Sequence, residues 1–234
     1  MEPIWDLHTG YEDLVAFREA YDDSQSFGAG YVAPRLQALY DATGEQKLQI
    51  YEQWCQGYDE EILSELGYIA PVKAGEVFAS HVYDRNSYIL DAACGTGLVG
   101  LQLSEYGYIN VDGLDFSLGM LERSTKKVVY KRFIHKDIAK PIGLDQRYDA
   151  AICVGLFGFG MPGIDSLAHL MASVKTGGVA VVTVNALAWA ELGLAEEVRR
   201  LGDAAGFLVE KIVDQAYIRN GKIRSNTLVI RRIG

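Results

Sequence analysis

From residue 87 onward, short apolar runs alternate with amphipathic segments. The apolar runs predict buried strands at residues 88–91, 111–115, 129–135, 150–154 and 179–184. Between most of them, helical spacing of apolar residues predicts helices at residues 98–106, 118–126, 164–174 and 187–205. Strands and helices that alternate in this way form parallel units. We therefore predict a doubly wound α/β fold, with a mostly parallel sheet and helices on both faces.

The end of the chain departs from this alternation. Residues 207–216 and 223–231 are two alternating runs separated by Asn220-Gly221, a strong signal for a hairpin turn. We predict that these last two strands pair antiparallel. The complete sheet is then expected to have seven strands, with an antiparallel last strand.

The first 85 residues have helical spacing and no convincing strand. The residues that follow this spacing are Tyr11, Leu14, Val15, Arg18, Tyr21, Leu36, Leu39 and Tyr40. We expect two parts in the chain. Residues 1–85 form a helical leader or lid, and residues 86–234 form the main domain.

Local signals place helix ends in the first part. Thr43 and Gln46 have the spacing of a capping box, which predicts that a helix starts there. Asp59 is a candidate cap for a further short helix that Gly67 ends in a left-handed conformation. Pro71 suits the first turn of the next helix.

Composition narrows the class of protein. The 234 residues carry 22 basic and 31 acidic side chains, a formal net charge of −9, and 49% of the residues are hydrophobic and 23% charged. These proportions are typical of folded soluble domains. The negative charge argues against nucleic acid as the main partner, because phosphate backbones are bound by clusters of Lys and Arg.

The cysteines and the apolar stretches indicate the compartment. Cys55, Cys94 and Cys153 are widely spaced and form no C-x-x-C pair, which fits neither a disulfide framework nor a zinc site. The chain begins with acidic residues where a signal peptide is basic, and no apolar run reaches 18 residues. We expect a soluble cytoplasmic protein that holds no metal and binds no membrane. Its oligomeric state stays open.

The sharpest motif is a glycine-rich turn that joins a predicted buried strand to a helix. Gly95, Gly97 and Gly100 have the G-x-G-x-x-G spacing, and Asp115 follows at the end of the next predicted strand. Glycines let a ligand approach the backbone closely, and a carboxylate at this distance downstream holds a ribose. The pattern therefore indicates a cofactor that contains adenosine.

The charge near this turn distinguishes two cofactors. Asp91 stands four residues before Gly95, where its carboxylate would repel the pyrophosphate of NAD. The same carboxylate suits S-adenosylmethionine (SAM), which carries an ammonium and a sulfonium. In the alternative interpretations, Asp91 only braces the turn and Asp115 only caps the following helix, a role that Ser117 could take instead.

The segments Asp91-x-x-Cys94-Gly95-Thr96-Gly97 and Gly113-Leu114-Asp115-Phe116-Ser117-x-x-Met120-Leu121 resemble the first two motifs of class I SAM-dependent methyltransferases. A closer likeness is to the methyltransferase-like group named after the Williams–Beuren syndrome chromosomal region, and it includes Tyr51…Tyr58-Asp59 and Leu98-Val99. The resemblance covers residues 45–234. It implies SAM as the cofactor and S-adenosylhomocysteine as the product.

The resemblance also implies roles for individual residues. Gly95, Thr96 and Gly97 belong to the turn that passes close to the methionine portion of SAM, with Asp91 near the ammonium. Asp115 accepts both ribose hydroxyls, and Phe116 and Met120 flank the adenine. Asp137 and Ile138 meet the adenine edge, and Val154 lies near the methyl group. For Asp137 the alternative is a solvated loop acid.

The catalytic residues are not identified by the sequence. Displacement at a sulfonium needs a base only where the nucleophile arrives protonated and weak, and no residue shows itself as that base. Tyr51 and Tyr58 lie in the helical leader, residues 1–85, which we call the lead-in. In relatives this segment folds over the cofactor. One hydroxyl would contact SAM, or both side chains would pack the lid on the core.

The segment 154–162 is apolar and glycine-rich, where amine-modifying nucleic-acid methyltransferases carry an Asn/Asp-Pro-Pro-aromatic motif. Together with the negative charge, this favours a small, partly apolar acceptor. We predict a SAM-dependent methyltransferase that acts on a small molecule. The alternatives are a non-enzymatic module that senses SAM and, with less support, an NAD-dependent oxidoreductase.

Overall fold

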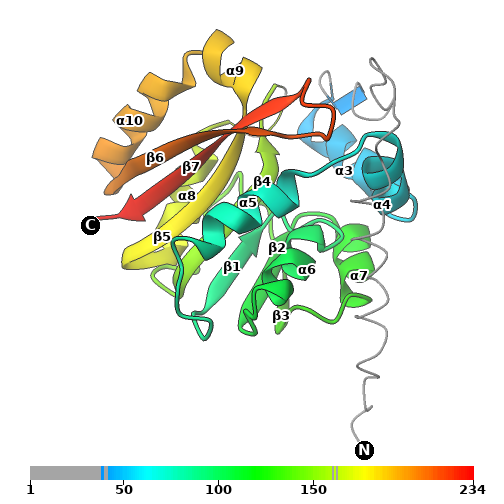
Figure 1. Cartoon of the computed structure of the whole chain (residues 1–234), viewed down its shortest axis with the longest axis horizontal. Coiled ribbons are helices and arrows are strands. Elements are labelled where there is room, and N and C mark those ends of the chain that lie inside the picture. Colours follow the sequence, from blue (N-terminus) through cyan, green and yellow to red (C-terminus); the bar gives the residue numbers. More distant parts are fainter. Residues whose placement is uncertain (1–37, 40–41, 160, 162) are drawn as a thin grey trace, which may run out of the picture.

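The computed structural model describes residues 38–39, 42–159, 161 and 163–234. Its centre is a seven-stranded sheet in the order β3-β2-β1-β4-β5-β7-β6 (Figure 1). The strands are β1 (Ile89–Ala92), β2 (Val111–Asp115), β3 (Arg132–His135), β4 (Tyr148–Phe157), β5 (Val174–Asn185), β6 (Phe207–Ala216) and β7 (Arg224–Arg232). Strands β1 to β5 pair in parallel, whereas β7 runs antiparallel to both β5 and β6. The predicted fold class is confirmed, including the antiparallel last strand.

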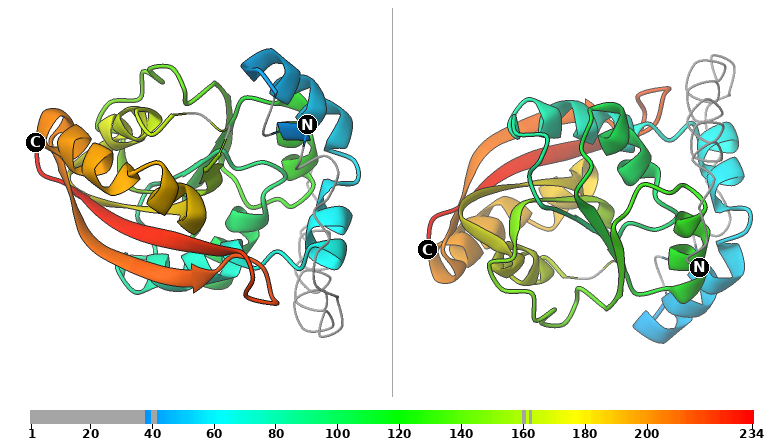
Figure 2. Two further views of the ribbon diagram at one scale, coloured as in Figure 1. Left: turned by 90° about the horizontal axis from the view of Figure 1, so that it is seen from above. Right: turned by 90° about the horizontal axis from the view of Figure 1, so that it is seen from below.

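Helices cover both faces of this sheet, as the views from above and below show (Figure 2). They are α3 (Gly44–Trp54), α4 (Tyr58–Glu60), the π-helix η1 (Glu61–Glu65), α5 (Ala70–Ala79), α6 (Leu98–Glu105), α7 (Leu118–Thr125), α8 (Ser166–Ser173), α9 (Ala186–Glu191) and α10 (Leu194–Ala205). Helices α5 and α6 pack in one hydrophobic core, and α8 and α10 pack in a second one.

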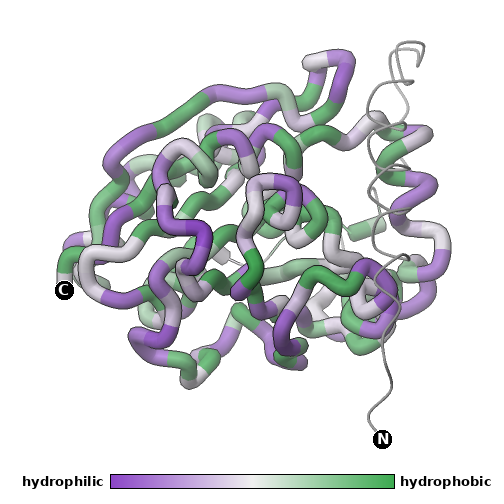
Figure 3. The backbone as a smooth tube through the Cα atoms, turned by 60° about the horizontal axis from the view of Figure 1, so that its bottom comes forward, coloured by the Kyte–Doolittle hydropathy of each residue, from purple (hydrophilic) through white to green (hydrophobic). Residues whose placement is uncertain are grey.

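Alternation along the strands explains the two cores. In β4, Ile152 and Val154 belong to the first core, and Ala151 and Cys153 belong to the second. Successive side chains of a strand point to opposite faces, so a strand covered on both faces must be apolar almost throughout. Figure 3 shows the hydrophobic stretches running through the interior of the molecule and the hydrophilic residues along its outer turns.

The sequence placed most elements correctly and some ends wrongly. Strands β2 and β6 have the predicted bounds, β3 is shorter than predicted, and β4 and β5 are longer. The single helix expected at residues 187–205 is two helices, α9 and α10. Gly193 lies between them with φ +63°, a left-handed conformation that ends the first helix.

The described part of the lead-in is helical, as predicted. Thr43 and Gln46 form the capping box at the start of α3, and Gly67 has φ +68°. The prediction that Asp59 caps a short helix is wrong: Gly57 stands at the cap position of α4, and the Asp59 side chain contacts the core domain instead. The helical pattern predicted for Tyr11 to Tyr21, and for Leu36 and Tyr40, lies outside the described residues.

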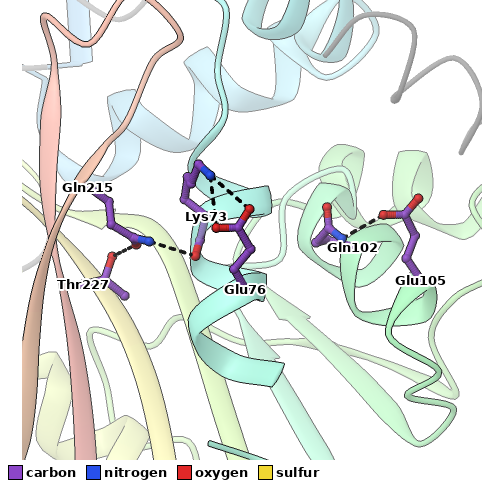
Figure 4. A network of polar contacts seen from close by, with 6 residues as sticks. All are labelled: Lys73, Glu76, Gln102, Glu105, Gln215 and Thr227. Carbon is purple, nitrogen blue, oxygen red and sulfur yellow. Dashed lines mark hydrogen bonds and ion pairs between the residues drawn. The ribbon is translucent and has the colours of Figure 1, made fainter. Parts of the chain in front are cut away.

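Helix α5 connects the lead-in to the sheet. Gln215 of β6 donates to the backbone oxygen of Lys73 (3.2 Å) and accepts from Thr227 of β7 (2.7 Å), while Lys73 pairs with Glu76 (3.0 Å) (Figure 4). Just before α5, Tyr68 forms an isolated β-bridge with Ile218. These contacts hold the end of the lead-in against strands from the opposite end of the chain.

Candidate functional site

A cavity of about 800 Å³ lies beyond the carboxyl ends of β1, β2, β3 and β4. In open parallel sheets, ligands bind at this edge, at the point where the strand order reverses. Here that point is β1, which has β2 on one side and β4 on the other. Helix α3 and Tyr58 line the side of the cavity that faces away from the sheet. The cavity therefore lies between the sheet edge and the lead-in.

Nine of the twelve residues predicted to hold the cofactor line this cavity: Tyr51, Tyr58, Gly95, Asp115, Phe116, Met120, Asp137, Ile138 and Val154. The other three, Asp91, Thr96 and Gly97, do not line it. The structure thus brings residues from four strand ends and the lead-in together. Thr96 and Gly97 instead face protein groups.

Asp115 stands at the end of β2 with its carboxylate held on both sides. One oxygen accepts from the backbone N–H of Gly95 (2.8 Å), and the other accepts from the N–H of Ser117 (2.9 Å). Ser117, not Asp115, caps helix α7. Burial raises the pKa of Asp115 to about 6, although these backbone hydrogen bonds oppose the shift.

The three fingerprint glycines have different surroundings. Gly95 has φ +54°, and a Cβ built on it would meet nothing within 4 Å, so space remains for a ligand beside its backbone. By contrast, a Cβ on Gly97 or Gly100 would lie 3.2 Å and 2.5 Å from the ring of Tyr130. Of the three, only Gly95 therefore faces open space. Gly100 leaves room for Tyr130, whereas Gly97 has φ +96°, which itself favours glycine, and a Cβ there would also lie 3.3 Å from Lys127 and from Ser124.

Asp91 at the end of β1 is fully buried. One carboxylate oxygen accepts from the hydroxyl of Tyr130 (2.6 Å), and the other, Oδ1, has no hydrogen-bond partner among the described residues. Burial raises the pKa of Asp91 to about 7, and the nearby Asp115 adds to the shift, while the Tyr130 hydrogen bond lowers it. A buried carboxylate oxygen without a partner is costly and fits a cationic ligand group.

Helix α3 is fixed on the core domain by Glu52. Its carboxylate accepts from the hydroxyl of Ser117 (2.8 Å) and from the backbone N–H of Gly119 (3.0 Å), at the N-terminus of α7. A carboxylate at a helix N-terminus is stabilised by the backbone N–H groups there. On the cavity side of α3, the ring of Tyr51 lies edge-on to Phe116, with 5.8 Å between the centroids.

Asp59 makes a second attachment of the lead-in. It forms an ion pair with Lys127 (2.6 Å) and accepts a hydrogen bond from the hydroxyl of Thr96 in the glycine turn. Thr96 therefore contacts the lead-in and does not line the cavity. Asp59 lies one residue after Tyr58, which lines the cavity, so this ion pair also holds the position of that ring.

The predicted adenine side contains Phe116, Met120, Asp137 and Ile138. Asp137 accepts from the N–H of Ala139 (2.9 Å) and lies 3.8 Å from the ammonium of Lys140. Both the turn and the ion pair leave Asp137 on the cavity wall.

At the end of β4, Val154, Gly155, Leu156 and Met161 give the cavity an apolar end. Gly155 has φ +83°, and a Cβ there would lie 2.9 Å from the hydroxyl of Tyr68 and 3.1 Å from that of Tyr217. Burial raises the pKa of the Tyr58 and Tyr68 phenols well above the usual value, and neighbouring phenols add to both shifts. These side chains remain neutral and protonated.

Sequence reasoning missed five residues that shape the site: Glu52, Tyr68, Lys127, Tyr130 and Tyr217. None belongs to a motif, and each acts on a residue distant in the chain. No local pattern in the sequence indicated that the ring of Tyr130 fills the space beside Gly100.

Other site types are not indicated in the described part of the chain. No group of three or more metal-ligating side chains occurs among these residues. Cys55, Cys94 and Cys153 are free and buried. No described helix combines the length and the apolar character needed to cross a membrane.

Residues 89–178 match the sequence profile of a family described as a methyltransferase domain. The match runs from the start of β1 into β5 and contains both the glycine turn and Asp115. The chain is also 31% identical over 145 residues to methyltransferase-like protein 27 of Homo sapiens, a stretch that is 59% of this chain and 57% of that protein. The chain thus spans little more than half the length of this relative.

Solved structures share the fold. The [4+2]-cyclase SpnF is similar with a TM-score of 0.64 and 17% identity, over 82% of this chain and 98% of that chain. A SAM-dependent methyltransferase from Leishmania major is similar with a TM-score of 0.61 and 16% identity, over 82% and 86% of the two chains. These likenesses show a Rossmann-like methyltransferase fold. With the profile match, they support the resemblance to class I SAM-dependent methyltransferases.

Proposed function

We propose that this protein transfers a methyl group from SAM to a small-molecule acceptor. The observation that carries the proposal is the joint placement of Gly95 and Asp115 at the cavity wall, with open space beside the glycine and a fixed carboxylate next to it. The match of residues 89–178 to a methyltransferase domain supports the same chemistry.

The residues present fit SAM. Asp115 would hold the ribose hydroxyls with the acceptor capacity left on its two oxygens. Phe116, Met120, Asp137 and Ile138 would enclose the adenine, and the unpartnered oxygen of buried Asp91 would receive the ammonium, directly or through a water molecule. The cationic ligand would also lower the pKa of Asp91, which burial and the nearby Asp115 carboxylate raise.

When bound, SAM supplies a methyl group on a sulfonium, which is an excellent leaving group. The chain would hold the cofactor and the acceptor in position and exclude water. The lid residues Tyr51 and Tyr58 close one side of the cavity, and Val154 and Gly155 close the other. The protonated phenols can donate hydrogen bonds to an acceptor but cannot take its proton.

The small-molecule acceptor is inferred from the apolar end of the cavity at Leu156 and Met161 and from the net charge of −9. The finer likeness, to the methyltransferase-like group of the Williams–Beuren region, is part of this proposal and is supported by the 31% identity to methyltransferase-like protein 27. A cytoplasmic location and a lid formed by residues 1–85 complete it.

The test uses SAM labelled in its methyl group and three acceptor pools: a small-molecule extract, total RNA and total protein. Label transferred to the small-molecule pool is expected. Transfer to RNA or protein contradicts the acceptor class. Binding of S-adenosylhomocysteine without transfer to any pool indicates a SAM-binding module, and thermal stabilisation by NADH in its place indicates an oxidoreductase.

Asp115→Ala tests the cofactor site directly. Hydrogen bonds to a charged group contribute about 1.5–3 kcal/mol, so the variant is expected to bind S-adenosylhomocysteine about 10- to 150-fold more weakly by calorimetry. Asp149→Ala is the control, because Asp149 pairs with Lys175 away from the cavity (2.7 Å). An unchanged affinity in Asp115→Ala contradicts the assignment.

A further inference from the structure

Tyr130 follows α7 and precedes β3 in the chain, and its ring packs beside three glycines and against Phe133. A Cβ on Gly97, Gly100 or Gly113 would lie 3.2 Å, 2.5 Å and 3.3 Å from its ring. A ring of this size packed against both α6 and β2 cannot turn freely, so its hydroxyl has a fixed position. Gly100 and Gly113 leave room for this ring rather than for a ligand.

The hydroxyl of Tyr130 donates to one oxygen of Asp91 (2.6 Å) and leaves the other oxygen, Oδ1, without a partner among the described residues. The carboxylate is fully buried. The titratable groups coupled to it are Asp115, Cys94, Cys153 and Tyr130 itself, and all four are acids. None of these groups supplies a positive charge.

We infer that Tyr130 is a positioning residue for the cofactor: its hydroxyl holds one oxygen of Asp91 and leaves the other free to accept from the ammonium of SAM, directly or through a water molecule. This inference rests on the proposed function. In this arrangement, the glycine fingerprint has two parts. Gly95 leaves space for the ligand, and Gly100 leaves space for the tyrosine that holds the ligand's partner.

A change in pH separates positioning from simple packing. The hydrogen bond favours the ionised carboxylate, so Tyr130→Phe is expected to keep Asp91 protonated to higher pH. Binding of the ammonium then requires loss of that proton. A hydrogen bond to a charged group corresponds to about a tenfold change or more, which moves the midpoint by roughly one to two pH units.

The experiment is calorimetry with S-adenosylhomocysteine between pH 6 and pH 9 on the wild-type protein, Tyr130→Phe and Tyr148→Phe. Tyr148 is the matched control: it is also buried and donates to a buried carboxylate, that of Asp112 (2.9 Å), and it does not line the cavity. The ratio of the two Kd values at each pH cancels the titration of the ligand itself.

For Tyr130→Phe, the Kd ratio to wild type is expected to be about 5- to 50-fold at pH 7, from a midpoint that rises by one to two pH units, and to shrink toward pH 9. For Tyr148→Phe it is expected to stay near one. A ratio for Tyr130→Phe that does not change with pH overturns the inference and leaves the proposed function standing. Failure of the wild-type protein to bind S-adenosylhomocysteine overturns the proposed function, and the inference with it.

A second measurement needs no ligand. Carbon-13 NMR of the aspartate carboxyl groups, assigned through Asp91→Asn, follows the titration of Asp91 directly. The midpoint is expected to rise by roughly one to two pH units in Tyr130→Phe and to stay unchanged in Tyr148→Phe. An unchanged midpoint in Tyr130→Phe overturns the inference even where ligand binding is impaired.

Discussion

At pH 8, replacing Asp91 by asparagine should stabilise the ligand-free protein. The same substitution should abolish cofactor binding. Burial raises the pKa of Asp91 from 3.8 to about 7. Because the folded state holds this proton more tightly than the unfolded state, Asp91 contributes stability that is fully present below pH 3.8. That contribution is lost as the pH rises to about 7.

The magnitude follows from the size of the shift. A shift of about three pH units corresponds to about 4 kcal/mol, since one unit is 1.36 kcal/mol. Asparagine resembles the protonated carboxyl in shape and carries no charge, so it avoids this loss. In a domain of this size 1 kcal/mol moves Tm by about 2–4 °C, and Asp91→Asn is expected to melt roughly 10 °C higher than wild type at pH 8.

Calorimetric melting at pH 5 and at pH 8 measures the effect. The gain is expected to be large at pH 8 and much smaller at pH 5, and S-adenosylhomocysteine should stabilise the wild type alone. Asp149→Asn is the control of opposite sign, because Lys175 and the backbone N–H of Tyr88 outweigh burial and lower the pKa of Asp149. A gain for Asp91→Asn that is the same at both pH values refutes the reasoning.

Two further predictions concern the lid and the turn. Glu52→Ala removes the attachment of α3 to α7 and is expected to speed the dissociation of S-adenosylhomocysteine about tenfold, measured by stopped flow. Gln53→Ala, on the exposed side of α3, is the control and should leave the dissociation rate unchanged. Equal rates in the two variants count against a lid. Gly100→Ala places a Cβ 2.5 Å from Tyr130 and is expected to lower the free energy of unfolding by about 1–3 kcal/mol, measured by chemical denaturation. Gly95→Ala should instead weaken ligand binding most. The reverse pattern contradicts the division of the glycine fingerprint into two parts.

Much of the fold could be predicted because its signals are local. The apolar strands, the Asn220-Gly221 turn and the capping box at Thr43 each act over a few residues, and each was confirmed. The break between α9 and α10 at Gly193 was missed, because a glycine inside an amphipathic pattern does not by itself reveal its φ angle. Strand ends shifted because pairing with neighbouring strands decides where a strand stops.

The site was predictable where it depends on strand ends and less so where it depends on side-chain packing. Asp115, Phe116 and Val154 line the cavity because parallel strands end at one edge. Asp59 was interpreted as a helix cap, yet its partner Lys127 lies 68 residues away in the chain. Likewise, Tyr130 reaches Asp91 across 39 residues, and no local pattern announces such a contact.

The β-bridge between Tyr68 and Ile218 has a consequence for biosynthesis. The backbone N–H of Ile69 donates to the oxygen of Tyr217 (3.1 Å), and that of Arg219 donates to the oxygen of Gly67 (2.8 Å). The segment that leads into α5 is therefore tied to residues that follow the first five strands in the chain. Strands β1 to β5 can pair before residues 217–219 are synthesised, whereas this tether, and the packing of Tyr217 beside Gly155 at the cavity wall, can form only afterwards.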